Sequence, residues 1–202
     1  MRLFRPFYLS GWIYPGVVYR IKTTEKLLCL TFDDGPDPGS TPYLLEVLEI
    51  YGVKAIFFCN GRSSERYPDL IEKIISSGHI VGNHGYDHPD GWKTSLKKYI
   101  ADIENSATFT SANLFRPPYG RLSPFQYLKL KKTYSIFLWD VMPYDFDTSF
   151  GADNCLRVLK KKIRPGSIIV LHDHANSMAK SVIKDFIEFA IHGGYRFTIY
   201  ID

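Results

Sequence analysis

Two carboxylates and two imidazoles stand out in this sequence because their types and spacing suit a metal site. Asp33 and Asp34 directly follow the apolar run at residues 27–32, and His84 and His88 lie four apart further along the chain. One carboxylate and two imidazoles form a common open coordination set for Zn²⁺, Fe²⁺, Co²⁺ or Mn²⁺, which leaves positions for water and substrate. The second carboxylate would then be available as a base.

The elements that must position these residues follow an alternating order. Apolar strand-like runs alternate with helical patterns, without an internal repeat or a linker. The pattern predicts strands at about residues 27–32, 54–58, 79–82, 114–115, 134–139, 167–171 and 195–200, and helices at about 41–51, 66–77, 94–109, 123–132, 152–162 and 178–192. Strands joined by helices favour a parallel sheet, which either closes as a (β/α) barrel or opens as a doubly wound fold.

Residues capable of chemistry follow several of these predicted strands. Besides the four residues above they include Arg116, Trp139, Asp140 and His172. The carboxyl ends of parallel strands meet at one edge of the sheet, so we expect these side chains to converge there. This convergence favours an enzyme.

Composition narrows the class of protein. The 202 residues are 45% hydrophobic and 15% aromatic, which indicates one well-packed globular domain and excludes a disordered chain. The formal charge of +4 is mild. The basic residues form short clusters on predicted helices, so we expect solvated helix faces and no nucleic-acid partner, and nothing indicates an obligate protein partner. Cys29, Cys59 and Cys155 lack CxxC spacing and are expected to be buried free thiols.

Residues 1–22 are predicted to form a separate N-terminal segment before a domain at 23–202. The segment is basic and aromatic, but Gly11, Pro15 and Gly16 interrupt its apolar stretch. This is a poor signal peptide, and no run approaches the roughly 18 apolar residues of a spanning helix. We therefore expect a cytoplasmic protein or one peripheral on a membrane, with the segment packed on the domain or resting on the membrane surface.

Four motifs together match a known family. They are TFDDGP at residues 31–36, HGYDH at 84–88, RPPYG at 116–120 and LHD at 171–173. In this combination and order the chain resembles the polysaccharide deacetylases, the NodB-homology group also called carbohydrate esterase family 4. The resemblance covers residues 25–200 and implies that 23–202 is a catalytic domain with a distorted (β/α) barrel of about seven parallel strands.

The resemblance also implies a metal and a base. Asp34, His84 and His88 would hold one divalent metal, with Zn²⁺ as the first choice and Co²⁺, Mn²⁺, Fe²⁺ or Ni²⁺ as alternatives. Asp33 would be the general base that accepts a proton from the attacking water. Arg116 would orient this base and pair with its charge.

Further roles concern the substrate. The backbone N–H of Tyr119, in a loop shaped by Pro117, would help to stabilise the oxyanion, and His172 would donate a proton to the departing amine. Trp139 and Leu171 would form the walls of a slot for the acetyl methyl group.

Three positions depart from the family pattern. Gly85 stands where the family has Ser or Thr, which would remove a hydrogen bond that braces the ligand loop. Met142 and Phe146 replace the first Asp and the Trp of an Asp-x-x-Asp-Trp segment. Since that Asp normally partners the catalytic histidine, His172 would lose its orienting carboxylate unless one of Asp145, Asp140 or Asp147 substitutes, with Asp145 as the first candidate.

Three functions remain open at this point. The first is a metal-dependent hydrolase that removes N-acetyl or O-acetyl groups from an acetylated polysaccharide or oligosaccharide, such as peptidoglycan, a chito-oligosaccharide or a glycolipid precursor. The second is an amidohydrolase acting on a small non-carbohydrate amide or imide. The third is a glycan-binding protein that holds the metal without turnover.

Overall fold

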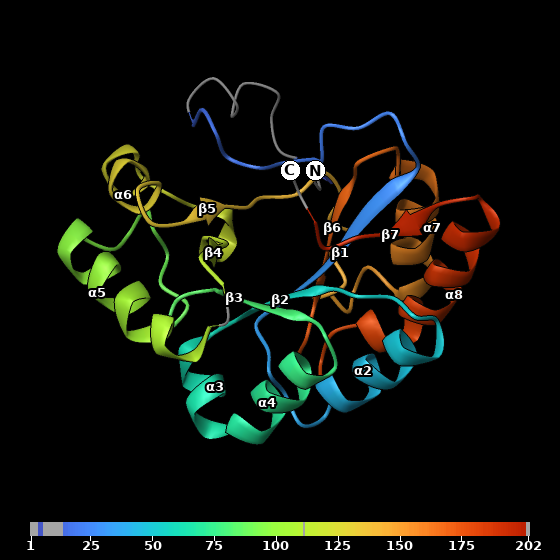
Figure 1. Ribbon diagram of the computed structural model, residues 1–202, viewed down its shortest axis with the longest axis horizontal. Helices are drawn as coiled ribbons and strands as arrows, with labels where there is room; N and C mark the ends of the chain where they lie inside the picture. Colours follow the sequence, from blue (N-terminus) through green and yellow to red (C-terminus); the bar gives the residue numbers. More distant parts are fainter. Residues whose placement is uncertain (1–3, 6–13, 111, 201–202) are drawn as a thin grey trace.

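The fold is built from one parallel sheet of seven strands, seen in a computed structural model that describes residues 4–5, 14–110 and 112–200 (Figure 1). The strands are β1 (Leu27–Asp33), β2 (Ile56–Cys59), β3 (Ile80–Asn83), β4 (Leu114–Phe115), β5 (Ser135–Ile136), β6 (Ile168–His172) and β7 (Arg196–Phe197). Six run in the order β5-β4-β3-β2-β1-β6, and β7 pairs with the start of β1.

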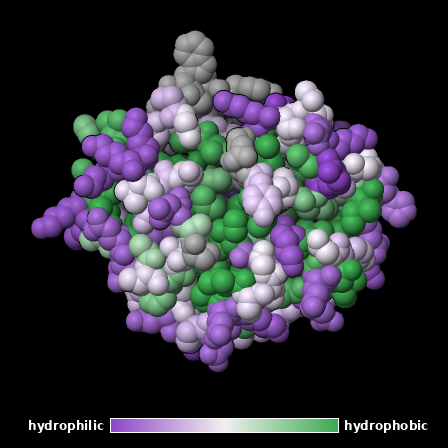
Figure 2. Space-filling view, viewed as in Figure 1, coloured by the Kyte–Doolittle hydropathy of each residue, from purple (hydrophilic) through white to green (hydrophobic). Residues whose placement is uncertain are grey.

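Helices cover the outer side of the strands, and Figure 1 shows them around three sides of the sheet. They are α2 (Thr41–Ile50), α3 (Gly61–Arg66), α4 (Pro68–Ser76), α5 (Leu96–Ser106), α6 (Pro124–Leu130), α7 (Ala152–Lys162) and α8 (Ala179–His192), with short 3-10 turns η1 (Ala107–Phe109) and η2 (Pro118–Gly120). Figure 2 shows hydrophilic residues around the rim of the same face and hydrophobic residues nearer its middle.

The helix predicted at 66–77 is confirmed as α4, which begins slightly later at Pro68, but the separate short helix α3 before it was not predicted. Tyr67 has φ −129° and ψ 60° and precedes Pro68, the first residue of α4. A proline disfavours helical backbone in the residue before it, so a continuous helix cannot form there. Asn60 caps α3 by accepting a hydrogen bond from the Ser63 N–H at 2.8 Å.

The sheet curls into a distorted barrel, as predicted, and an irregular segment completes it. After β5 the Phe137 N–H still donates to the Phe115 carbonyl on the β4 side. Three residues later the Asp140 N–H donates to the Ile168 carbonyl at 2.9 Å, and Val141 forms a parallel bridge with Ile169. The predicted strand at 134–139 is therefore shorter, since the chain leaves β4 and crosses to β6.

Two hydrophobic layers lie on opposite sides of the strands. Cys29, Ile56 and Phe58 belong to the cluster inside the barrel, whereas Leu30 and Phe32 belong to the larger cluster shared with the helices. Successive strand residues point to opposite faces, so Asp33 lies on the same side of β1 as Cys29. The barrel interior thus leads directly to the end of β1 that carries the two aspartates.

The described parts of the N-terminal segment contact the domain. The Val18 N–H donates to the Ile136 carbonyl at 2.8 Å, and the Phe4 carbonyl accepts from the Met142 N–H at 3.1 Å. Residues 6–13, which hold part of the predicted apolar stretch, lie outside the described residues. Within the described residues no helix has the length and apolar character to cross a membrane, and the three cysteines are buried and form no disulfide.

Candidate active site

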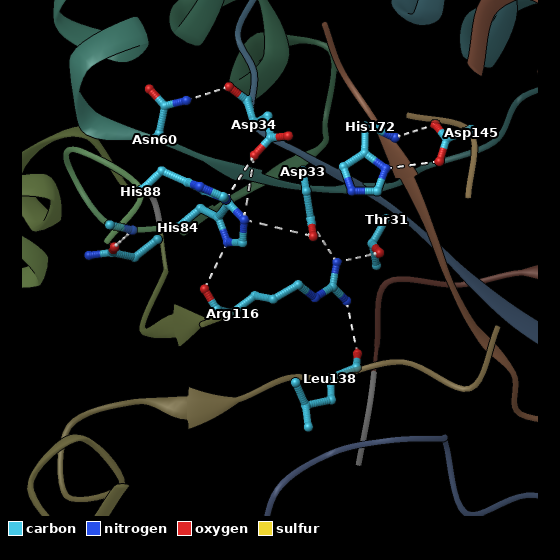
Figure 3. Close-up of polar contacts among 12 residues, drawn as sticks. Thr31, Asp33, Asp34, Asn60, His84, His88, Arg116, Leu138, Asp145 and His172 are labelled. Atoms are coloured by element: carbon cyan, nitrogen blue, oxygen red, sulfur yellow. Dashed lines mark hydrogen bonds and ion pairs between the residues drawn. The ribbon is translucent and has the colours of Figure 1, made fainter. Parts of the chain in front are cut away.

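Asp34, His84 and His88 come together at the carboxyl ends of β1 and β3, as the sequence predicted (Figure 3). Asp34 Oδ1 lies 3.6 Å from His84 Nε2 and 3.2 Å from His88 Nε2. Ligand atoms about 2.1 Å from a tetrahedral ion are about 3.4 Å apart, so these separations fit one metal ion.

The protonation of the two histidines also fits a metal. His84 Nδ1 lies 2.8 Å from the Arg116 carbonyl, which can only accept, so Nδ1 carries a proton and Nε2 is the ring nitrogen that faces Asp34. Burial, followed by the charge of His84, lowers the pKa of His88 to about 4, so its ring is neutral at pH 7. Burial alone would raise the pKa of Asp34, but the neighbouring histidines, His84 first, outweigh it and lower that pKa. The donor set is therefore ready for a divalent cation.

Asp33 lies beside this triad without belonging to it. Its Oδ1 accepts a hydrogen bond from the Arg116 guanidinium at 2.6 Å, and its Oδ2 lies 3.9 Å from His84 Nε2. Asp33 is only 4% exposed, and Arg116 is fully buried. One carboxylate oxygen is thus anchored and the other points toward the triad.

Arg116 is held inside the barrel by groups that the sequence analysis did not identify. The guanidinium donates to Thr31 Oγ1 at 2.7 Å and to the Leu138 carbonyl at 3.0 Å, and it lies 4.2 Å from the centre of the Phe58 ring. Thr31 could have been found from sequence, because a polar residue two before Asp33 in a strand shares its face.

His172 lies across the site on β6, paired in register with Asp33 on β1. Its Nδ1 is 2.8 Å from Asp145 Oδ1, and its backbone N–H donates to Asp145 Oδ2 at 2.7 Å (Figure 3). Asp145 is fully buried and thus provides the carboxylate that Met142 cannot provide. Burial would lower the pKa of His172, but the charge and hydrogen bond of Asp145 raise it to about 9, so the ring is an imidazolium at pH 7.

The other two alternative partners of His172 are engaged elsewhere. Asp140 binds the Arg164 guanidinium and accepts from Ser167 Oγ at 2.6 Å, at the point where the barrel closes. Asp147 accepts from the Ser149 N–H at 3.1 Å. Geometry therefore selects Asp145.

A cavity of about 800 Å³ opens over these groups. Pro117, Tyr119 and Trp139 line it, as do Asp33, Asp34, His84, His88 and His172. Tyr119 has left-handed backbone with φ 58°, and its ring packs edge-on against His88 with centroids 4.5 Å apart. Trp139 packs against Gly120, where an added Cβ would lie 2.6 Å from the indole.

The position of Leu171 contradicts its predicted role as a wall of the acetyl slot. It is fully buried in the hydrophobic cluster between the sheet and the helices, and it is not among the residues that line the cavity. His172 faces the site, and the preceding strand residue must point to the opposite face. Leu171 therefore stabilises the core and does not form a wall of the slot.

Aromatic and basic residues that sequence reasoning missed form part of the cavity wall. Trp92 is 69% exposed, and the Arg121 guanidinium lies 5.1 Å from the centre of its ring. Arg5 and Tyr14 reach the cavity from the N-terminal segment. None of these follows a predicted strand, so no sequence signal connected them with the site.

Together these groups define a class of protein. A parallel barrel that gathers a carboxylate–dihistidine site, a free buried carboxylate and an imidazolium around one cavity is equipped for metal-assisted hydrolysis.

Comparisons with known proteins specify the family. The family model described as polysaccharide deacetylase matches residues 20–134. A peptidoglycan-N-acetylglucosamine deacetylase of Bacillus cereus (strain ATCC 14579) is 31% identical over 192 residues, which cover 90% of each chain. A chitooligosaccharide deacetylase of Azorhizobium caulinodans is 32% identical, with 78% of this chain and 79% of the relative covered. The crystal structure of the Bc1960 peptidoglycan N-acetylglucosamine deacetylase with a bound hydroxamate-type benzamide superposes with a TM-score of 0.87 at 28% identity, covering 95% of this chain and 94% of that one. The chain belongs to the polysaccharide deacetylase family.

Proposed function

We propose that this deacetylase removes acetyl groups from the N-acetylglucosamine units of a glycan, such as peptidoglycan or a chito-oligosaccharide. The names of both relatives support this substrate class, since peptidoglycan and chito-oligosaccharides share N-acetylglucosamine. The cavity supports it as well. Its volume of about 800 Å³ exceeds what an acetamide group needs, and its wall includes the exposed aromatic rings of Trp92, Tyr119 and Phe146. Aromatic faces of this kind suit sugar rings better than a small imide.

The metal would be held by Asp34, His84 and His88, with Zn²⁺ as the first choice for this donor set. When bound there, a divalent metal would supply a Lewis acid for the acetamide carbonyl and would lower the pKa of water.

Asp33 is the proposed general base. The observation that carries this proposal is that its two carboxylate oxygens have different partners. Oδ1 is held by Arg116 at 2.6 Å, whereas Oδ2 faces the histidines and can accept the proton of the attacking water. The buried guanidinium compensates the buried carboxylate. Asp33 can therefore remain in place while it gains and loses a proton.

His172, on the strand next to that of Asp33, is the proposed general acid. Because Asp145 raises the pKa of His172 to about 9, the ring carries a proton at pH 7 that it can pass to the leaving amine. The products are acetate and the free amino sugar. The Tyr119 N–H would donate to the oxyanion of the tetrahedral intermediate, and Trp139 would contact the acetyl methyl group.

The test is acetate release from N-acetylglucosamine oligomers and peptidoglycan fragments by protein stripped of metal and then titrated with Zn²⁺ or Co²⁺. We expect metal-dependent release that Asp33→Asn abolishes while it retains the metal. Asp153→Asn, which changes an exposed carboxylate on α7, is the matched control and should release acetate at the normal rate.

Two results would redirect the proposal. Hydrolysis of small cyclic imides without acetate release from any glycan would favour the amidohydrolase alternative. Glycan binding at full metal occupancy without turnover would favour the inactive binding protein. The pairing of Asp145 with His172 argues against the latter, because the carboxylate whose loss motivated that hypothesis is present.

A further inference from the structure

The loop that joins the two metal-ligating histidines has an unfavourable backbone conformation. Gly85 has φ 77° and His88 has φ 54°, both in the left-handed region. This region costs a non-glycine residue about 1 kcal/mol or more, so surrounding contacts must hold the loop in place.

A carboxylate on a neighbouring helix holds the middle of this loop. Asp102 Oδ1 accepts the Tyr86 N–H at 2.7 Å, and Asp102 Oδ2 accepts the Asp87 N–H at 3.0 Å. Asp102 lies on α5, which the fully buried Tyr99 and Ile103 anchor to the domain. Both oxygens of one fixed carboxylate thus bind consecutive peptide groups between the ligands.

Other peptide groups of the loop bind the start of α3 and the end of β3. The Gly85 carbonyl accepts from the Gly61 N–H at 2.9 Å, and the Tyr86 carbonyl accepts from the Arg62 N–H at 3.1 Å. The Gly85 N–H donates to Asn83 Oδ1 at 2.8 Å. Among the described residues, Asp102 is the helix side chain that binds backbone N–H groups of this loop, whereas Arg62 and Glu65 on α3 bind the side chains of Asp87 and Tyr86.

Gly85 also lies directly against the Asp102 carboxylate. A Cβ added to Gly85 would lie 2.9 Å from Asp102 Oδ1 and 2.9 Å from Pro89 Cδ. A side chain at position 85 and the carboxylate at position 102 therefore compete for the same volume. Because Gly85 has no side chain, the Asp102 carboxylate has room beside the loop. The sequence indicated that the loop loses a supporting hydrogen bond at Gly85, but the carboxylate of Asp102 supports the loop.

We propose that Asp102 is a positioning residue of the metal site. By holding the Tyr86 and Asp87 peptides it sets the separation and direction of the His84 and His88 rings, and so sets the affinity for a divalent metal. This inference rests on the metal site of the proposed function. Outer groups that orient metal ligands typically contribute 10- to 100-fold to metal affinity.

The test is a Co²⁺ titration of the metal-free protein, followed by the visible absorption of the bound ion, for wild type, Asp102→Asn and Glu104→Gln. The amide of Asp102→Asn keeps one acceptor and turns an N–H group toward the second peptide N–H. We expect about a 10-fold or greater loss of Co²⁺ affinity and a changed absorption band. Glu104→Gln makes the same chemical change at an exposed position of α5 and should match wild type.

Three outcomes separate this inference from the proposed function. Wild-type affinity and spectrum in folded Asp102→Asn would overturn the role of Asp102 and leave the metal site intact. A lower unfolding midpoint with unchanged affinity would also overturn it, since that is the result of a purely structural role. If wild type and His88→Ala bind Co²⁺ equally, the metal site itself fails, and this inference fails with it.

A second measurement tests the link between Gly85 and Asp102. Gly85→Ala is made in wild type and in an Asp102→Ser background, and urea unfolding midpoints of the metal-free proteins are compared. Backbone strain and the Pro89 contact are common to both. We expect Gly85→Ala to lower the midpoint less in the Asp102→Ser background, and an equal loss in both would refute the competition for space.

Discussion

Replacing Asp145 with Asn isolates the group that keeps His172 protonated. The carboxylate is fully buried and binds both the ring Nδ1 and the backbone N–H of His172, at 2.8 and 2.7 Å. Asparagine has nearly the same shape and retains an acceptor, so the change removes the negative charge with little change in volume. Burial, which opposes the imidazolium, is left in place.

The magnitude follows from the position of the His172 pKa. Its rise from 6.5 to about 9 corresponds to about 3 kcal/mol in favour of the imidazolium. Without the charge of Asp145, burial is opposed only by the smaller contributions of Asp34 and Asp33, and we expect the pKa to return to about 6.5. At pH 7 the protonated fraction then falls from nearly complete to about a quarter, a fourfold loss of the general acid before any loss of orientation.

Two assays read this change. The ring pKa is measured by NMR titration of His172, and kcat/KM for acetate release is measured from pH 6 to 10. In wild type the alkaline limb of the rate profile should lie near pH 9, and in Asp145→Asn it should move down by about two pH units or more. Asp147→Asn, two residues away, is the matched control and should leave both measurements unchanged.

The pH dependence of the unfolding free energy provides an independent test of the raised His172 pKa. The pKa of His172 is raised on folding, so its contribution is fully present below pH 6.5 and is lost as the pH rises through about 9. Asp145→Asn should remove this alkaline loss. A His172 pKa that stays near 9 in the variant, or a rate profile that does not move, would refute the assignment of Asp145 as the group that maintains the imidazolium.

Two further predictions concern stability and the cavity wall. Burial raises the pKa of Asp173 from 3.8 to about 7, although Thr41 donates a hydrogen bond to its carboxylate at 2.6 Å. The folded protein therefore holds this proton more tightly than the unfolded chain. The unfolding free energy of the metal-free wild type should fall between pH 4 and 7 by up to about 4 kcal/mol relative to Asp173→Asn. Urea unfolding at several pH values measures this, and parallel pH curves for the two proteins would contradict it. Gly120→Ala should cost about 2–4 kcal/mol and lower kcat/KM, because its Cβ would lie 2.6 Å from Trp139 in addition to the strain of φ 65°. Gly52→Ala has a similar φ of 62° and open space around it, so it should lose only about 1 kcal/mol and no activity, and equal losses would rule out the contact with Trp139.

Sequence reasoning located the catalytic edge because strand ends are visible in a linear pattern. Asp33, His84 and Arg116 each follow an apolar run, and the topology of parallel strands brings such positions together whatever the details of packing. The same reasoning was less accurate where short elements depend on their neighbours. The helix predicted at 66–77 begins only at Pro68, the short helix α3 before it was missed, and β5 contains only the two residues Ser135 and Ile136.

Tertiary structure decided which neighbours support the reactive groups. Asp145, Asp140 and Asp147 were all candidates for His172 in sequence, with Asp145 first, and only the path of the chain between β5 and β6 placed Asp145 against the ring. The face on which Leu171 lies was decided by its place next to His172 in β6.

The sequence by itself determined the family, and it predicted the cluster of Asp34, His84 and His88 and the strand edge that carries it, because these depend on residue type and on short-range periodicity. Only the tertiary structure decided that Thr31 holds Arg116 inside the barrel, that Trp92 and Arg121 form part of the cavity wall, and that Asp102 reaches the histidine loop. Each of these contacts joins segments that are distant along the chain. Their existence depends on how helices and loops pack around the sheet, and local sequence patterns do not encode that packing.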